Sequence, residues 1–155
     1  MSIQEQLNST REAARSLVKI TAEESAKIIR EIADALIANS DKIVAENAKD
    51  LARMDPKNPN YDRLMLNKER IEGIASDTRN VAGLPAPCGE VIEERTLENG
   101  LLLKKVRVPL GVVGVIYEAR PNVTIDVASL CLRSGNAVVL KGGSDAADSN
   151  VVMVE

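Results

Sequence analysis

The apolar positions in the first half of the sequence recur three and four residues apart, the spacing of one face of an α-helix. Stripes of this kind run over residues 7–18, 28–37 and 43–51, and residues 67–83 repeat the pattern. Polar or turn-forming residues separate the runs. We therefore expect four helices, one after another, before any strand.

Helix boundaries are indicated by residues that satisfy free backbone groups at helix ends. Thr21, followed three residues later by Glu24, is the pattern of a capping box at the start of the second helix. Ser40 is expected to cap the third helix and Asn67 the fourth. Gly83 is expected to stop the fourth helix.

The pattern changes to that of strands after a linker at residues 84–89. The runs VIEERTL and LLLKKVRV flank Glu98-Asn99-Gly100. Asn-Gly between such runs predicts a hairpin with a type I′ turn, which needs positive φ at both central residues. A lone two-stranded ribbon is marginally stable, so the hairpin needs a surface to lie on, and a neighbouring subunit is one candidate.

The last third alternates apolar strands with helices. Strands are expected at 112–116 and 137–140, with one helix after Pro121 that ends at Gly135 and another from Asp145. Fully apolar strands in this order predict an α/β fold with a parallel sheet covered on both faces. Two strands are too few for a doubly wound sheet, so we expect the sequence to be the front part of a longer protein.

Composition narrows the possible functions. The chain has no Phe, Trp or His. Its core must therefore be aliphatic, and His-dependent triads and His metal sites are excluded. A net charge of −3 and two aromatic residues argue against nucleic-acid binding. Two distant cysteines, a polar N-terminus and no long apolar run favour a cytoplasmic protein without a membrane segment.

Polar residues follow both predicted strands, at the end where parallel sheets bind ligands. Gly142 and Gly143 would let backbone amides approach an anion, and Lys141 with Ser144 suits a nucleotide that carries an extra phosphate. The alternative is a plain glycine turn with a solvated lysine. The G-x-G-x-x-G fingerprint is absent, so a standard dinucleotide-binding turn is not supported.

The residues after the first strand also allow two interpretations. The amide of Asn122 can donate to a developing oxyanion, or Asn122 can simply cap the helix. Arg120 can bind a substrate or cofactor phosphate, or pair with Glu118 on the surface. Asp126 is expected in the first turn of the helix and Cys131 in the core.

The segments YEARPNVT and CLRSGNAVVLKGGS closely resemble the gamma-glutamyl phosphate reductases, a branch of the aldehyde dehydrogenase superfamily. Other branches have Pro-Trp-Asn in place of Arg120-Pro121-Asn122 and Lys-Pro in place of Lys141-Gly142. The N-terminal helices and the hairpin are similar too, so the resemblance covers essentially the whole chain. It implies an aldehyde dehydrogenase-like fold.

The resemblance implies NADPH-dependent reduction of gamma-glutamyl phosphate to glutamate 5-semialdehyde with release of phosphate, the second step of proline biosynthesis. It implies that Asn122 stabilises a thioester oxyanion and that Lys141 and Ser144, in the loop with Gly142 and Gly143, contact the adenosine ribose or its 2′-phosphate. It assigns 1–89 and 110–155 to a nucleotide-binding domain. Residues 90–109 would be the oligomerisation hairpin of a cytoplasmic homo-oligomer.

One departure from the family is large. Its nucleophilic cysteine lies in a catalytic domain beyond the position of Glu155, and neither Cys88 nor Cys131 matches it. We therefore expect this segment alone to be inactive. The alternatives are a non-catalytic module for nucleotide binding or self-association, and another reductase of the superfamily, such as an acyl-CoA reductase.

Overall fold

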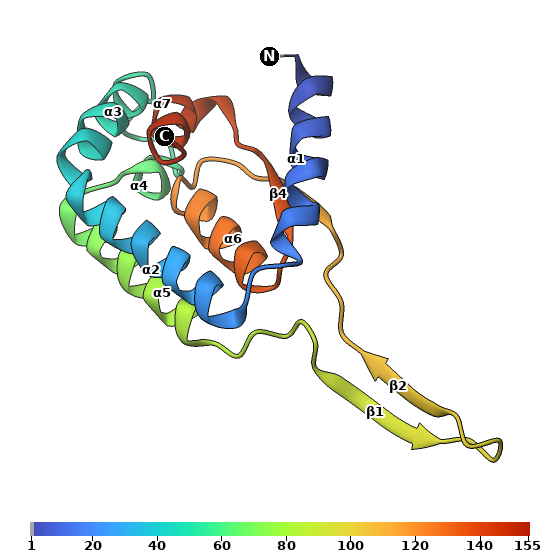
Figure 1. Cartoon of the computed structure of the whole chain (residues 1–155). Coiled ribbons are helices and arrows are strands. Elements are labelled where there is room, and N and C mark those ends of the chain that lie inside the picture. Colours follow the sequence, from blue (N-terminus) through green and yellow to red (C-terminus); the bar gives the residue numbers. More distant parts are fainter. Residues whose placement is uncertain (1) are drawn as a thin grey trace.

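The computed structural model describes residues 2–155, and helices dominate its first half (Figure 1). The four predicted helices are confirmed. An additional short helix, α4, lies between the third and fourth of them. The bounds are α1 Ile3–Leu17, α2 Ala22–Ala38, α3 Ser40–Ala52, α4 Tyr61–Leu64 and α5 Lys68–Gly83.

Three of the predicted helix boundaries are confirmed and one is wrong. Thr21 and Glu24 form the predicted capping box. Asn67 accepts a hydrogen bond from the Arg70 amide as the cap of α5, which ends at Gly83. Ser40, however, is the first residue of α3 and not its cap. The helices α2 and α3 share Asn39 as a boundary residue, so no separate position remains for a serine cap.

A parallel pair of strands with a connecting helix follows, as predicted. Strands β3 (Val112–Ile116) and β4 (Ala137–Lys141) pair in register, and α6 (Asn122–Arg133) joins them. A short 3₁₀ turn, Ser144–Ala146, then leads into α7 (Ala147–Val152). This is the predicted α/β arrangement.

The covering of this sheet differs between its two strands. Helices α1 and α6 both pack against β4 and flank it in Figure 1. Along β3, in contrast, every second residue is exposed, and Ile116 is 83% exposed. The prediction that both faces are covered is therefore correct for β4. It is wrong for β3, because one face of that strand is exposed.

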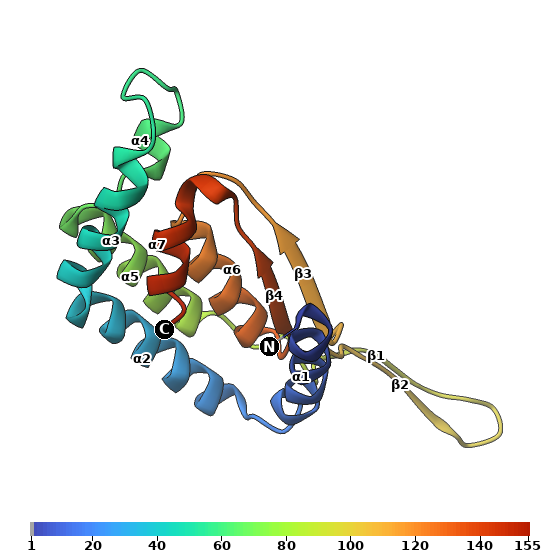
Figure 2. The ribbon, with the colours of Figure 1, turned by 90° about the horizontal axis from the view of Figure 1, so that it is seen from above.

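The hairpin projects away from the rest of the molecule (Figures 1 and 2). Strands β1 (Val91–Thr96) and β2 (Leu102–Val106) are antiparallel, and every residue in them is exposed. The type I′ turn is wrong: Gly100 has a φ of 83°, but Asn99 does not have positive φ. The Leu97 amide donates to the Leu101 carbonyl at 2.8 Å, which leaves a three-residue loop with a single left-handed glycine.

The core is aliphatic, as the composition requires, and lies between α2, α3, α5, α6 and α7. Its members are Ala33, Leu36, Ile43, Leu66, Ile71, Ile74, Ala75, Ile125, Val152 and Met153. On α3, however, Ala48, an apolar residue within the predicted stripe 43–51, is exposed, whereas Asn47 and Asp50 are buried. The inner side of α3 is therefore partly polar. No helix within residues 2–155 combines the length and apolar character needed to cross a bilayer.

Candidate functional site at the strand ends

The carboxyl ends of β3 and β4 lie side by side. Ile116 pairs with Lys141, and the Tyr117 amide continues the ladder by donating to the Lys141 carbonyl at 3.1 Å. A Cβ atom built on Gly143 would lie 3.4 Å from the Cα of Glu118. The two loops that sequence reasoning singled out, 117–122 and 141–144, are therefore in backbone contact.

The chain reverses at Ala119 to reach α6. Ala119 has a φ of 37° and is buried at 3% exposure. A left-handed conformation is uncommon for a residue with a Cβ and persists only where its surroundings hold it. This bend places Pro121 at the cap position of α6 and Asn122 in its first turn.

Asn122 is not a helix cap, so that interpretation is wrong. It is the first residue of α6, and the cap position, Pro121, has no side-chain cap hydrogen bond. The Nδ2 atom of Asn122 instead donates to Oδ2 of Asp126 at 3.0 Å. One Nδ2–H bond is thereby used, and the second remains for another acceptor.

Asp126 lies beyond the first turn of α6, which contains no acidic residue, so the dipole interpretation is also wrong. Burial raises the pKa of Asp126, the hydrogen bond from Asn122 lowers it in part, and Asp77 on α5 raises it further. The carboxyl group of Asp126 therefore holds the side-chain amide of Asn122 in place.

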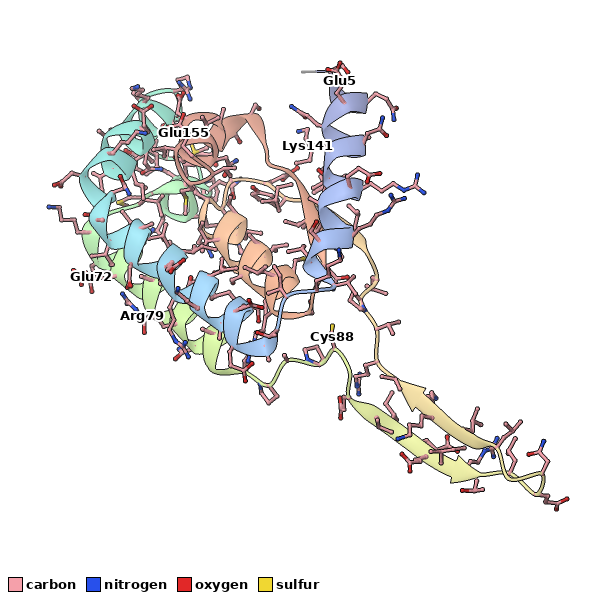
Figure 3. All side chains as sticks on the ribbon, viewed as in Figure 1. Glu5, Glu72, Arg79, Cys88, Lys141 and Glu155 are labelled. Carbon is pink, nitrogen blue, oxygen red and sulfur yellow. The ribbon has the colours of Figure 1, made fainter. Side chains whose placement is uncertain are left out.

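The polar side chains around the loops are accessible. Lys141 is exposed, and its Nζ donates to the neighbouring Gly142 carbonyl at 2.9 Å (Figure 3). Arg120 and Ser144 are exposed as well, and within residues 2–155 no ion pair joins Arg120 to Glu118. Two cations and a hydroxyl beside a glycine loop are an arrangement that suits an anionic ligand.

The side chain of Asn150 packs against Gly142. A Cβ atom at this position would lie 2.2 Å from Nδ2 of Asn150 on α7. Sequence reasoning attributed both glycines to the approach of a ligand. The structure gives Gly142 a second reason, which is its close contact with the Asn150 side chain of α7.

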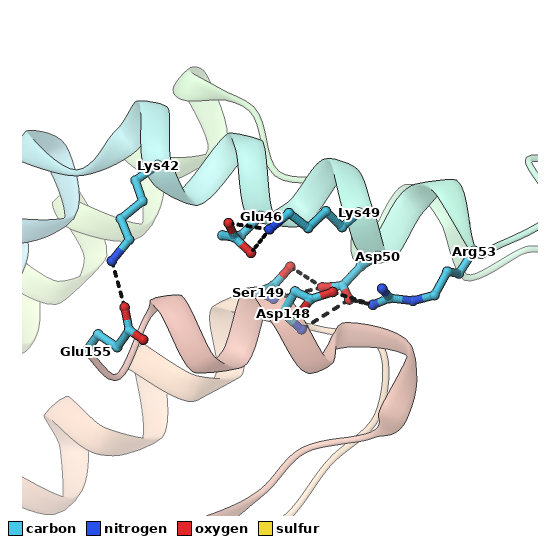
Figure 4. Close-up of polar contacts among 8 residues, drawn as sticks. All are labelled: Lys42, Glu46, Lys49, Asp50, Arg53, Asp148, Ser149 and Glu155. Carbon is cyan, nitrogen blue, oxygen red and sulfur yellow. Dashed lines mark hydrogen bonds and ion pairs between the residues drawn. The ribbon is translucent and has the colours of Figure 1, made fainter.

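A buried polar cluster holds α7 in place, and sequence reasoning missed it (Figure 4). Oδ2 of Asp50 accepts hydrogen bonds from the amide of Ser149 at 2.8 Å and from its hydroxyl at 2.6 Å. Nδ2 of Asn47 donates to the same hydroxyl at 2.9 Å, and Arg53 pairs with Asp148 at 2.7 Å. The signal in the sequence was a pair of polar residues, Asn47 and Asp50, at positions of α3 that face the core.

The two cysteines lie elsewhere. Cys131 is buried as predicted, and burial raises the pKa of its thiol. Cys88 is exposed, and its Sγ donates to the Ser134 carbonyl near the start of β4 (Figure 3). That is the end of the strand opposite Lys141. Neither cysteine stands beside Asn122.

Comparisons with known proteins agree on one family, although no protein-family model matches the sequence. Over 154 residues the chain is 55% identical to the gamma-glutamyl phosphate reductase of Chlorobium phaeobacteroides. The match covers 99% of this chain and 37% of that relative. The chain therefore spans little more than a third of the length of the curated relatives it matches.

Solved structures give the same result. The gamma-glutamyl phosphate reductase of Thermotoga maritima superposes with a TM-score of 0.93 at 39% identity, covering 97% of this chain and 37% of that one. A NAD-dependent benzaldehyde dehydrogenase from Corynebacterium glutamicum superposes with a TM-score of 0.73 at 25% identity, covering 94% of this chain and 30% of that one. The predicted aldehyde dehydrogenase-like fold is confirmed.

Proposed function

We propose that this chain corresponds to the N-terminal portion of a gamma-glutamyl phosphate reductase and supplies the nucleotide-binding part of that enzyme. The full-length protein would reduce gamma-glutamyl phosphate to glutamate 5-semialdehyde with NADPH and release phosphate. The observation that carries the proposal is the 55% identity over 154 residues with a reductase of that name.

The residues at the strand ends fit a nicotinamide nucleotide. Lys141 and Ser144 are exposed beside the loop after β4, and they are proposed to hold the ribose and its 2′-phosphate. Gly142 and Gly143 add no side chains of their own to that loop, and the side chain of Asn150 packs against Gly142. When bound, NADPH supplies the hydride. Arg120 is proposed to neutralise a phosphate of the substrate or the cofactor.

Asn122 is proposed to stabilise negative charge on the reacting carbonyl oxygen. Its Nδ2 is held by Asp126 at 3.0 Å, and the second N–H bond is free to donate. A donor fixed before the reaction needs no reorganisation when the charge develops. The covalent step requires a nucleophile, and the described residues place no thiol at this site.

The hairpin is proposed to join two copies of the protein. Residues 90–109 are the oligomerisation element, and residues 1–89 and 110–155 belong to the nucleotide-binding domain. The fully exposed strands β1 and β2, which carry exposed Ile92, Leu102 and Leu103, support this assignment. We also propose that the homo-oligomer works in the cytoplasm.

The activity is tested on the full-length protein that contains this segment. Run in reverse, with glutamate 5-semialdehyde and NADP⁺, a gamma-glutamyl phosphate reductase forms NADPH only when phosphate is added. Dependence on coenzyme A instead of phosphate would indicate an acyl-CoA reductase. No turnover with either would favour a non-catalytic module.

The cofactor assignment has its own test. Replacing Lys141 by Ala removes the cation proposed to contact the 2′-phosphate, so the KM for NADPH should rise about ten-fold while that for NADH changes little. Lys19→Ala, at an exposed lysine near the end of α1, is the matched control. Equal effects of Lys141→Ala on both nucleotides would argue against the 2′-phosphate contact.

A further inference from the structure

Three side chains from separate elements form one hydrogen-bonded chain behind the strand ends. The hydroxyl of Tyr117, which follows β3, lies 2.6 Å from Oγ1 of Thr124 in the first turn of α6. Thr124 Oγ1 in turn donates to Oδ1 of Asn150 on α7 at 2.9 Å. Thr124 is only 1% exposed, so its hydroxyl is shielded from water and depends on these two partners.

The direction of each hydrogen bond among the three side chains follows from the protons available. A threonine hydroxyl has one proton, and Thr124 uses it on Asn150. Tyr117 must therefore donate to Thr124. Since Oδ1 of Asn150 is the acceptor, its Nδ2 is turned the other way, towards Gly142, where a Cβ atom would lie only 2.2 Å from it.

The three hydrogen-bonded side chains reach both loops of the site. Thr124 is two residues from Asn122, in the same turn of α6, and Asn150 lies on the backbone of Gly142. Tyr117, Gly142 and Asn150 also line an open cavity of about 510 Å³. The three side chains therefore connect the helix turn that carries Asn122 with the Gly142 loop.

We propose that Tyr117, Thr124 and Asn150 are positioning residues, which set the spacing between Asn122 and the Gly142-Gly143 loop. The catalytic meaning of this spacing rests on the proposed function. The mechanical coupling does not, because it is inferred from the hydrogen bonds among these three side chains. The two claims can therefore be tested separately.

Amide hydrogen exchange of the full-length protein that contains this segment tests the coupling, because it reads out structure and not activity. Tyr117→Phe removes one hydrogen bond and keeps the ring, so peptides covering 117–126 and 141–150 should both exchange about five-fold faster, the size expected for one neutral hydrogen bond. The chain has one other tyrosine, Tyr61, and Tyr61→Phe should leave both peptides unchanged. Faster exchange in only one peptide, or in neither, would overturn the coupling.

Kinetics of the full-length protein test the positioning role. Thr124→Val is nearly isosteric and lacks the hydroxyl, so it should raise the KM for NADPH about five-fold and lower kcat by a similar factor. Thr124→Ser keeps the hydroxyl and should restore both constants. Parent-like constants for a folded Thr124→Val protein would overturn the positioning role. An inactive parent protein would instead contradict the proposed function, and the exchange experiment would still decide the coupling.

Discussion

Asp126 accepts a hydrogen bond from the side-chain amide of Asn122 at 3.0 Å, one turn further along the same helix. The hydrogen bond holds Nδ2 of Asn122 against Asp126. The second N–H bond of Nδ2 then remains available to donate to a ligand. A carboxylate that is half removed from water is the cost of this arrangement, since burial raises the pKa of Asp126.

Asp126→Asn should stabilise the chain at neutral pH. A carboxyl group whose pKa is higher in the folded than in the unfolded state, here above 3.8, binds its proton more tightly when folded, so its charged form lowers stability. The neutral amide can still accept from Asn122. Urea unfolding at pH 7 should show a gain of about 0.5 kcal/mol, kept small because solvent screens a half-buried group.

The pH dependence provides the control for that substitution. As the pH falls through the folded-state pKa of Asp126, its carboxyl group is protonated, and the advantage of Asp126→Asn should shrink and vanish below pH 3.8. Asp145→Asn, at an exposed carboxylate, is the matched substitution and should change the stability at pH 7 little. A lower stability of Asp126→Asn at pH 7 would contradict the account.

Asp50→Ala should be strongly destabilising. It leaves the buried amide and hydroxyl of Ser149 without their acceptor, and we expect a loss of about 2–4 kcal/mol in the free energy of unfolding. Asp41→Ala on the same helix removes an exposed partner of Lys68 and should cost less than about 0.5 kcal/mol. Equal effects of the two substitutions would show that Asp50 does not hold α7.

Gly142→Ala should act through Asn150. The added methyl group would lie 2.2 Å from Nδ2 of Asn150, and we expect a loss of about 1–3 kcal/mol in the free energy of unfolding. In an Asn150→Ala background most of this loss should disappear, which a double-mutant cycle measures. Gly143→Ala, whose methyl group meets nothing closer than 3.4 Å, is the control. Strictly additive losses would refute the contact.

Charged residues on the hairpin should weaken self-association without unfolding the body. Leu102→Asp with Leu103→Asp removes two exposed apolar side chains from β2. From the proposed oligomerisation role of the hairpin, we expect sedimentation equilibrium to show an oligomer for the parent and a monomer for the variant. The melting temperature should change little, because both strands are exposed along their length. Ile3→Asp, at an exposed residue outside the hairpin, should still associate.

Features set by neighbouring residues in the sequence were predictable. The Thr21–Glu24 capping box and both parallel strands lie where the sequence indicates, because caps and strand runs depend on local spacing. The hairpin turn was not, since the hydrogen bond between Leu97 and Leu101 determines how many residues remain for the loop. Turn chemistry alone does not reveal that register.

In the candidate site, too, some features were predictable from the sequence and others were not. Both polar loops could be placed at the strand ends from the sequence, because the order of strands and helices determines where they lie. The position of Asn122 within α6 and the buried contacts of Asp50 could not be read there. The left-handed bend at Ala119 moves Asn122 out of the cap position, and the partner of Asp50, Ser149, is 99 residues away in the chain.

The most direct test of the account is the kcat of Asn122→Ala in the full-length protein, measured as phosphate-dependent formation of NADPH from glutamate 5-semialdehyde and NADP⁺. Loss of a fixed oxyanion donor should lower kcat by about 10²–10³-fold, with the KM for NADP⁺ nearly unchanged. A kcat close to that of the parent would contradict the assignment of Asn122, and with it the chemistry proposed for the strand ends.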